Sequence, residues 1–286
     1  MFQFDYLRPK DVNEALGKLR EAEVWPLSGG TNLFVDVRAG TIRPRVVLDI
    51  GFLQELRGLT YEKGLIEIGP CLTMTELANS PLIKWKAPLL GQSALSVGGP
   101  QIRNRATLGG NIASASPAAD TVVALVSLGA TVLLQSTKGV RKVLLEDLFV
   151  GPGQAKIEKD ELLTRIFFKA PSSNERGFFY KLGRRNALSV AVVNLGILAK
   201  TDETTRKWES VRIVLGSVAP TVMRAKKAEA LLSNRLVDEN LVREAAKTAA
   251  SECSPISDIR SSADYRRSMV EGLLERGLTG LIGVVR

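Results

Sequence analysis

The chain has 286 residues, 45% of them hydrophobic and 24% charged, a balance typical of a globular protein with room for two or three domains. It contains no histidine, which excludes histidine-based acid–base catalysis and histidine metal sites. Its two cysteines, Cys71 and Cys253, are too few for an iron–sulfur cluster or a structural zinc site held by this chain alone. Chemistry here would therefore depend on a bound cofactor.

The net charge of +9 is concentrated in residues 176–286, which hold 19 Lys or Arg and 12 Asp or Glu. Such a surface can attract nucleic acid, an acidic partner subunit or phosphates. The basic residues alternate with acidic ones on predicted helices and no aromatic platform accompanies them, which favours a solvated surface over nucleic-acid binding. No apolar stretch could span a bilayer and no secretory signal is visible, so a cytoplasmic location is expected.

The first predicted unit, residues 1–54, is small and α/β in character. Its apolar residues recur at helical spacing over 11–22, which predicts an amphipathic helix. Its other predicted elements are a strand over 4–8, a short helix or turn over 33–37 and a strand over 45–50.

The second predicted unit, residues 55–171, mixes strands and helices. Thr73, with Glu76 three positions later, predicts a capped helix over 73–79. Further helices are predicted over 81–93 and 121–127. The predicted strands cover 65–69, 130–136, 141–145 and 162–168, of which the middle two form a hairpin. The stretch 171–174 is the best linker candidate.

The third predicted unit, residues 176–286, opens at 177–185 and continues as strands followed by helices. Its buried strands cover 190–199 and 211–218 and belong to one antiparallel sheet. Its helices cover 224–232, 239–251 and 263–276. A run of strands followed by a run of helices predicts a separate α+β domain.

Two glycine-rich segments, both predicted to be loops, carry the residue types that hold a phosphate. The first is Ser28-Gly29-Gly30-Thr31-Asn32-Leu33, and the second is the stretch 106–120, which contains Thr107-Leu108-Gly109-Gly110-Asn111-Ile112. Glycines let backbone N–H groups approach a ligand, hydroxyl and amide side chains add donors, and Asp120 adds an acceptor for a sugar hydroxyl. Neither segment matches a P-loop or G-x-G-x-x-G. Both fit one ligand with a diphosphate, and two unrelated turns are the alternative.

Seven motifs in order along the chain resemble one family. They lie at 28–33, 101–104, 107–112, 116–120, 180–185, 219–225 and 264–267. Over essentially its full length the chain is similar to the FAD-binding medium subunit of the molybdenum hydroxylases, the family of xanthine dehydrogenase and carbon monoxide dehydrogenase. Ser28 stands where that family commonly has alanine, a small change that should not prevent binding.

The resemblance implies an α+β fold, with two α/β subdomains of the vanillyl-alcohol-oxidase-like (PCMH) type that clasp FAD, followed by a C-terminal domain of antiparallel sheet and helices. It implies an oxidoreductase subunit that takes electrons from iron–sulfur clusters on a partner and passes them through FAD to an acceptor such as NAD⁺. The implied partners are a molybdopterin-binding large subunit, where hydroxylation occurs, and a [2Fe-2S] small subunit. The chain itself would then hold no catalytic residue and no metal.

The resemblance also implies the FAD contacts. Asp120 matches a ribose or adenosine contact, and Leu163, or Leu162 by a one-residue slip, matches an apolar position near the adenine or flavin. Lys181 matches a lysine near the isoalloxazine ring, where a cation favours the reduced flavin. The implied contacts are Leu27, Ser28, Gly29, Gly30, Thr31, Asn32, Leu33, Phe34, Thr107, Leu108, Gly109, Gly110, Asn111, Ile112, Asp120, Leu163 and Lys181.

Alternatives remain open at the level of the sequence. A self-sufficient flavin oxidase or dehydrogenase would need an acid or base above the flavin, and only isolated tyrosine and arginine residues are candidates. A basic nucleic-acid-binding module would bind with a steep salt dependence. Lys181, taken without the family, has the pattern of a surface lysine. Arg103 and Arg105 flank the second segment and could approach the phosphates, face an acidic partner or form exposed ion pairs.

Overall fold

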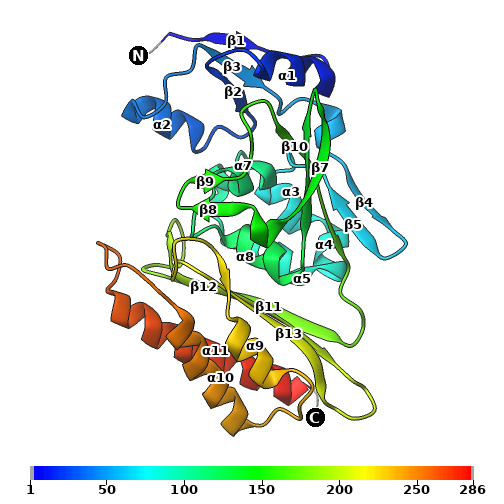
Figure 1. Cartoon of the computed structure of the whole chain (residues 1–286), viewed down its shortest axis with the longest axis vertical. Coiled ribbons are helices and arrows are strands. Elements are labelled where there is room, and N and C mark those ends of the chain that lie inside the picture. Colours follow the sequence, from blue (N-terminus) through cyan, green and yellow to red (C-terminus); the bar gives the residue numbers. More distant parts are fainter. Residues whose placement is uncertain (1–2, 285–286) are drawn as a thin grey trace.

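The computed structural model describes residues 3–284, and its elements are arranged around three main β-sheets (Figure 1). The first sheet is parallel, in the order β1-β3-β2. Its elements are β1 (Asp5–Leu7), α1 (Val12–Leu19), β2 (Val24–Leu27), α2 (Leu33–Ala39) and β3 (Val46–Asp49). The buried face of α1 carries Val12, Ala15, Leu16 and Leu19, as the helical spacing predicts, and the helix ends at Leu19 rather than at residue 22.

The second sheet is antiparallel and five-stranded, in the order β4-β5-β10-β6-β7. The predicted hairpin and the predicted strands 65–69 and 162–168 all lie in it. Its strands are β4 (Leu59–Glu62), β5 (Leu65–Ile68), β6 (Thr131–Ser136), β7 (Gly139–Leu144) and β10 (Leu162–Lys169). A small separate sheet pairs β8 (Phe149–Gly151) with β9 (Gln154–Ala155).

Six helices and two 3₁₀ turns accompany the second sheet. They are α3 (Met74–Asn79), α4 (Pro81–Lys86), α5 (Pro88–Ser96), α6 (Pro100–Arg103), α7 (Leu108–Ala113) and α8 (Asp120–Ser127), with η1 (Gln54–Leu56) and η2 (Leu145–Asp147). The capping box of Thr73 and Glu76 is present at the start of α3. The single helix predicted over 81–93 is two helices, because Pro88 cannot continue α4 and instead begins α5.

The second glycine-rich segment is helical, where a loop was predicted. Thr107 is the N-cap of α7, and its Oγ1 accepts a hydrogen bond from the N–H of Gly110 at 3.3 Å. Gly109 and Gly110 therefore lie in the first turn of a short helix. Glycine has low helix propensity, so the sequence pattern indicates a turn, but the cap and the surrounding packing stabilise the helix.

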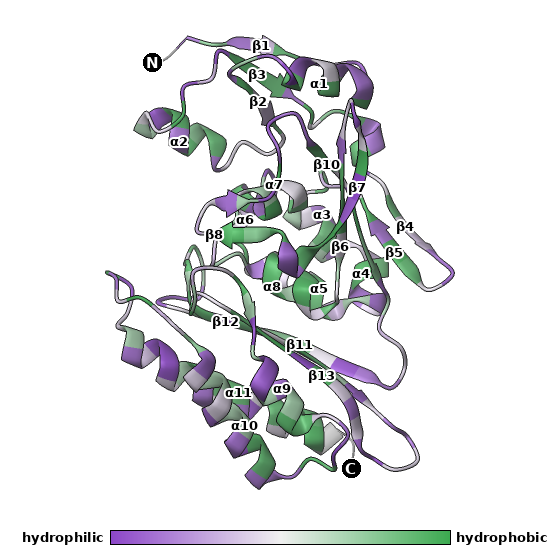
Figure 2. Cartoon of the chain, viewed as in Figure 1, coloured by the Kyte–Doolittle hydropathy of each residue, from purple (hydrophilic) through white to green (hydrophobic). Residues whose placement is uncertain are grey.

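The third sheet is antiparallel and is covered on one face by three helices (Figure 1). Its strands, in spatial order, are β11 (Glu175–Gly183), β12 (Ala191–Thr201), β13 (Trp208–Gly216) and β14 (Met223–Arg224). The covering helices are α9 (Lys226–Leu232), α10 (Glu239–Glu252) and α11 (Ala263–Val284). The opposite face packs on α5 and α8, and Figure 2 shows mostly hydrophobic residues along α8 and β12.

The helix α11 continues past residue 276, where the prediction ended it. Val270, Leu274, Leu278 and Leu281 are buried at helical spacing along it and continue the apolar face. Gly277, the residue after that predicted end, lies within the helix and allows close packing, because a Cβ at this position would lie 1.9 Å from the ring of Phe178. Within residues 3–284, no helix is both long and apolar enough to cross a membrane.

Candidate functional site

The first glycine-rich segment leads from β2 into α2. Gly30 has a φ of 74°, a left-handed conformation that glycine adopts without strain. Within the described part of the chain, the backbone N–H groups of Gly29, Gly30 and Thr31 donate no hydrogen bond. The hydroxyl of Ser28 is buried and likewise has no partner there. A bend with several unpaired hydrogen-bond donors offers the groups that bind an anionic ligand.

The two glycines of the second segment have different surroundings. The N–H of Gly109 donates to the carbonyl of Pro70 at 2.8 Å, and a Cβ on Gly109 would lie 2.5 Å from the Pro70 ring. The N–H of Leu108 donates to Leu72. Both amides are therefore unavailable to a ligand, and Gly109 is explained by packing. Gly110 is exposed, and only the Oγ1 of its own cap, Thr107, would approach a Cβ there.

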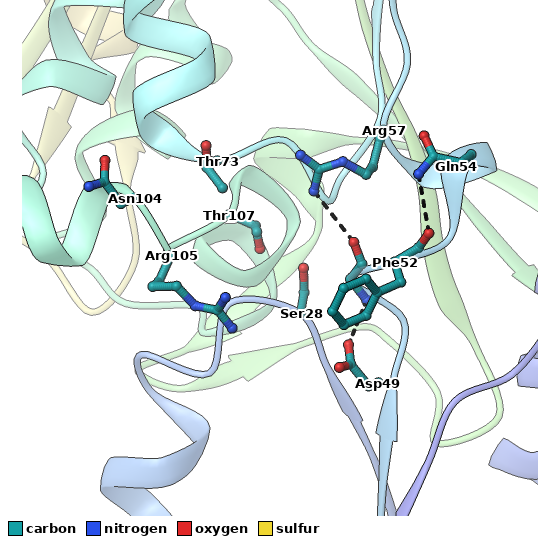
Figure 3. A pocket seen from close by; sticks show the side chains of 10 residues that line it. Ser28, Asp49, Phe52, Gln54, Arg57, Thr73, Asn104, Arg105 and Thr107 are labelled. Atoms are coloured by element: carbon teal, nitrogen blue, oxygen red, sulfur yellow. Dashed lines mark hydrogen bonds between the residues drawn. The ribbon is translucent and has the colours of Figure 1, made fainter.

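Folding brings the two segments side by side. A Cβ on Gly29 would lie 2.0 Å from the carbonyl oxygen of Arg105, so this contact requires glycine. A pocket of about 280 Å³ opens where they meet, and Figure 3 shows the side chains of Ser28, Arg105 and Thr107 converging on it. Its other lining residues are Asp49, Gly51, Phe52, Gln54, Arg57, Thr73 and Asn104.

Two arginine side chains, Arg57 and Arg105, line this pocket, and they differ in their hydrogen-bond partners. Arg57 is held by the carbonyl of Cys71 at 3.1 Å and by the carboxylate of Glu76. The guanidinium of Arg105 makes no hydrogen bond or ion pair within residues 3–284. Arg103, in contrast, donates to the carbonyls of Val97 and Gly98 and closes the turn before α6. Of the two flanking arginines, only Arg105 is available to a ligand at the pocket.

Asp120 and Lys181 form a buried ion pair. The Nζ of Lys181 lies 2.6 Å from Oδ2 of Asp120, and the side chains are 12% and 6% exposed. Lys181 also donates to the carbonyl of Ser96 at 2.9 Å, and Asn194 donates to Oδ1 of Asp120 at 2.8 Å. Burial raises the pKa of the Asp120 carboxyl, while the charge of Lys181 and the side-chain hydrogen bonds from Lys181, Asn194 and Ser96 oppose the rise.

Lys181 lines a second pocket, of about 220 Å³, whose wall is the segment that follows β11. This pocket shares no lining residue with the first, so the predicted residues fall into two places. Leu163 belongs to the hydrophobic core beside α8, and Leu162 packs in the core below the first sheet. Neither leucine lines either pocket.

The sequence did not single out Arg57, Asp49, Thr73 or Asn104 as pocket residues. Asp49 ends β3, where it accepts a hydrogen bond from Tyr6 and binds the N–H of Gly51 at 3.0 Å. Each of the four has an ordinary local role in a strand end, a cap or a turn, which is all that a single sequence reveals. Their position at the pocket depends on contacts between distant segments.

Comparisons with known proteins agree along the whole chain. Residues 2–170 match the family described as FAD binding domain in molybdopterin dehydrogenase, and residues 178–281 match the CO dehydrogenase flavoprotein C-terminal domain. The nicotinate dehydrogenase FAD-subunit of Eubacterium barkeri is 31% identical, over 96% of this chain and 95% of its own. The xanthine dehydrogenase FAD-binding subunit of Escherichia coli O157:H7 is 28% identical, over 96% and 95%.

Solved structures show the same fold. A chain of the carbon monoxide dehydrogenase from Hydrogenophaga pseudoflava superposes with a TM-score of 0.92 at 30% identity, over 97% of this chain and 96% of that one. A chain of quinoline 2-oxidoreductase from Pseudomonas putida 86 gives a TM-score of 0.92 at 25% identity, over 99% and 98%. This confirms the predicted α+β, PCMH-type fold and FAD as the cofactor. The chain belongs to the FAD-binding medium subunits of the molybdenum hydroxylase-type dehydrogenases, which are oxidoreductases.

Proposed function

We propose that this chain is the electron-transfer subunit of a heteromeric molybdenum hydroxylase. It would receive electrons from iron–sulfur clusters on a small [2Fe-2S] partner subunit and deliver them to an acceptor such as NAD⁺, while a molybdopterin-binding large subunit carries out hydroxylation. The observation that carries the proposal is the meeting of the two glycine-rich segments at Gly29 and Arg105, with unpaired donors on both sides.

Bound FAD would supply the redox chemistry. The residues of this chain bind and orient it. The free amides of Gly29, Gly30 and Thr31, the open surface at Gly110 and the unpaired guanidinium of Arg105 suit its diphosphate. The full set of proposed contacts remains 27–34, 107–112, Asp120, Leu163 and Lys181.

The hydrogen bonds of Asp120 support a particular role for it among these proposed contacts. Both of its carboxylate oxygens already accept hydrogen bonds, one from Asn194 and one from Lys181. We therefore assign Asp120 the role of holding Lys181, whose ammonium lies at the second pocket. Lys181 has three N–H donors, of which two are used, so one is left for the ring end of FAD.

We further propose three units, an N-terminal FAD-binding subdomain over 1–54, a second over 55–171 and an α+β domain over 176–286. Apart from Glu175, the first residue of β11, each of the three main sheets takes its strands from one of these ranges, which supports the division. We also propose a cytoplasmic location. Cys71 and Cys253 are both free and buried, as is usual for proteins of a reducing compartment.

The experiment purifies the chain from its native host under gentle conditions and analyses what accompanies it. We expect equimolar FAD together with subunits that contain iron and molybdenum. Hydroxylation substrates should reduce the FAD of the complex but not the FAD of the isolated chain. A chain that binds no FAD, or whose isolated FAD is reduced by a substrate, would contradict the proposal, and the second result would favour a self-sufficient flavoenzyme.

A further inference from the structure

A row of three residues crosses the third sheet beneath Asp120. Lys181 on β11 pairs with Asn194 on β12, and Asn194 pairs with Gly216 on β13. Directly opposite residues of antiparallel strands point to the same face of a sheet. Since α8 packs on β12 and β13, this row lies under the N-terminus of α8, where Asp120 is the first helical residue.

The side chains of Asn194 and Lys181 both donate hydrogen bonds to the carboxylate of Asp120. Asn194 is fully buried, and its Nδ2 donates to Oδ1 of Asp120 at 2.8 Å. The other carboxylate oxygen accepts from Nζ of Lys181 at 2.6 Å. Among the described residues, no hydrogen bond joins the side chains of Asn194 and Lys181 directly, so Asp120 is the group that links them, and of these three residues only Lys181 lines the second pocket.

The side-chain carbonyl of Asn194 takes no part in this hydrogen bonding. Its Oδ1 is buried and has no hydrogen-bond partner within residues 3–284, a costly arrangement for a polar atom. It also occupies space that a side chain at 216 would need, since a Cβ on Gly216 would lie 2.2 Å from it. The amide cannot turn round, because Oδ1 would then face the carboxylate of Asp120. The same Nδ2 also donates to the carbonyl of Ala118 at 3.4 Å, so the amide holds the start of α8 chiefly through Asp120 and more weakly through the preceding loop.

We propose that Asn194 is a positioning residue that, through Asp120, fixes the Lys181 ammonium at the second pocket and so sets the charge that bound FAD meets there. The statement about charge rests on the proposed function, while the fixing of Lys181 does not. Without Asn194, Oδ1 of Asp120 loses its 2.8 Å hydrogen bond, so the carboxylate orients the Lys181 ammonium less firmly, although Lys181 keeps its hydrogen bond to the carbonyl of Ser96.

The first test measures how well Lys181 is held, in the full-length chain without FAD. Acetic anhydride modifies free amines, and mass spectrometry gives the rate at Lys181 relative to the exposed Lys138. We expect Asn194→Ala to raise the relative rate several-fold. The control is Asn174→Ala, which removes a 3.1 Å hydrogen bond to Thr201 at the other end of the same sheet and should leave the rate unchanged.

An unchanged rate at Lys181 in Asn194→Ala would overturn the proposal. Circular dichroism verifies that each variant is folded. If Asn194→Ala does not fold, Asn194→Ser keeps a small polar side chain, is too short to reach Asp120 in the same way, and takes its place in the same comparison.

The second test measures the reduction potential of bound FAD in a double-mutant cycle with Lys181→Met. We expect Lys181→Met to lower the potential and Asn194→Ala to shift it in the wild-type background but not in the Lys181→Met background. An equal shift in both backgrounds would mean that Asn194 does not act through Lys181. If Lys181→Met leaves the potential unchanged while the acetylation result holds, the placement of Lys181 beside the flavin is wrong and the positioning by Asn194 stands.

Discussion

Adjacent glycines in this chain serve different purposes, and the structure separates them. Gly109 lets α7 approach Pro70, whereas Gly110 faces solvent with nothing but its own cap nearby. Gly29 lets the first segment touch the backbone of Arg105. The chemistry of a ligand site and the packing that builds it therefore use the same residue type at neighbouring positions.

Gly110→Val tests the ligand role directly. A β-branched side chain would stand where the diphosphate approaches, so we expect the dissociation constant for FAD to rise about tenfold or more, with a small loss of stability from the helix. The matched control is Gly17→Val, which places the same change on an exposed, open position of α1. Gly109→Val should instead lower the free energy of unfolding by about 2 kcal/mol, because its side chain would clash with Pro70. Equal FAD affinity in Gly110→Val and Gly17→Val would remove Gly110 from the site.

Arg105 offers a second test at the same pocket. Its guanidinium has no partner within residues 3–284, so Arg105→Gln should leave the unfolding temperature unchanged. If it contacts the diphosphate, FAD affinity should fall about tenfold, the usual worth of a charge-assisted hydrogen bond. Arg103→Gln is the comparison: Arg103 binds the carbonyls of Val97 and Gly98, so its loss should act mainly on stability. Isothermal titration calorimetry measures the FAD affinity of both variants. An unaltered affinity in Arg105→Gln would place the phosphates elsewhere.

At the scale of elements, α11 is fixed to the third sheet by a buried cation. Arg266 is 3% exposed and donates to the carbonyls of Val192 and Ser217 and to the carboxylate of Asp258. Arg266→Met would leave these acceptors unpaired, and we expect a loss of about 3 kcal/mol in the free energy of unfolding. The neighbouring Arg267→Met should cost less than about 0.5 kcal/mol, since its partner, Asp264, is 95% exposed. Chemical denaturation measures both, and equal losses would contradict the anchoring role.

The ion pair between Asp258 and Arg266 also predicts how the stability of the chain depends on pH. Burial opposes ionisation of Asp258, but hydrogen bonds from Arg260 and the charge of Arg266 outweigh it and lower its pKa to about 2. A carboxyl whose pKa falls on folding stabilises the protein above its unfolded value of about 4, and this contribution is lost as the pH falls toward 2. Asp258→Asn should therefore remove about 1 kcal/mol of stability at neutral pH and much less at pH 2. A loss independent of pH would contradict this.

At the scale of the whole molecule, local patterns in the sequence predict the elements, and contacts between distant residues decide the site. The capping box at Thr73 and the spacing along α1 are local, and both were predicted correctly. The pairing of Lys181 with Asp120 joins residues 61 positions apart, and no local pattern indicates it. The short helix at Gly109 was wrongly predicted as a loop because its stability comes from Pro70 and the Thr107 cap rather than from propensity.

The motifs that carried the family resemblance now have physical reasons. Arg266 in the motif 264–267 is the buried anchor of α11, and Lys181 in the motif 180–185 is half of a buried ion pair. From the sequence alone both have the pattern of surface charges, since burial of a cation depends on partners in other segments. The two glycine-rich segments, in contrast, indicated a shared ligand before the structure showed them in contact.

Hydrogen–deuterium exchange of the full-length chain, with and without FAD, tests the central claim most directly. The N–H groups of Gly29, Gly30 and Thr31 have no acceptor within residues 3–284, so FAD should slow their exchange, and it should slow exchange over 107–112 in parallel. Protection of both segments at the same FAD concentration is the predicted result. Protection of only one of them, or of neither, in a chain saturated with FAD would contradict the account.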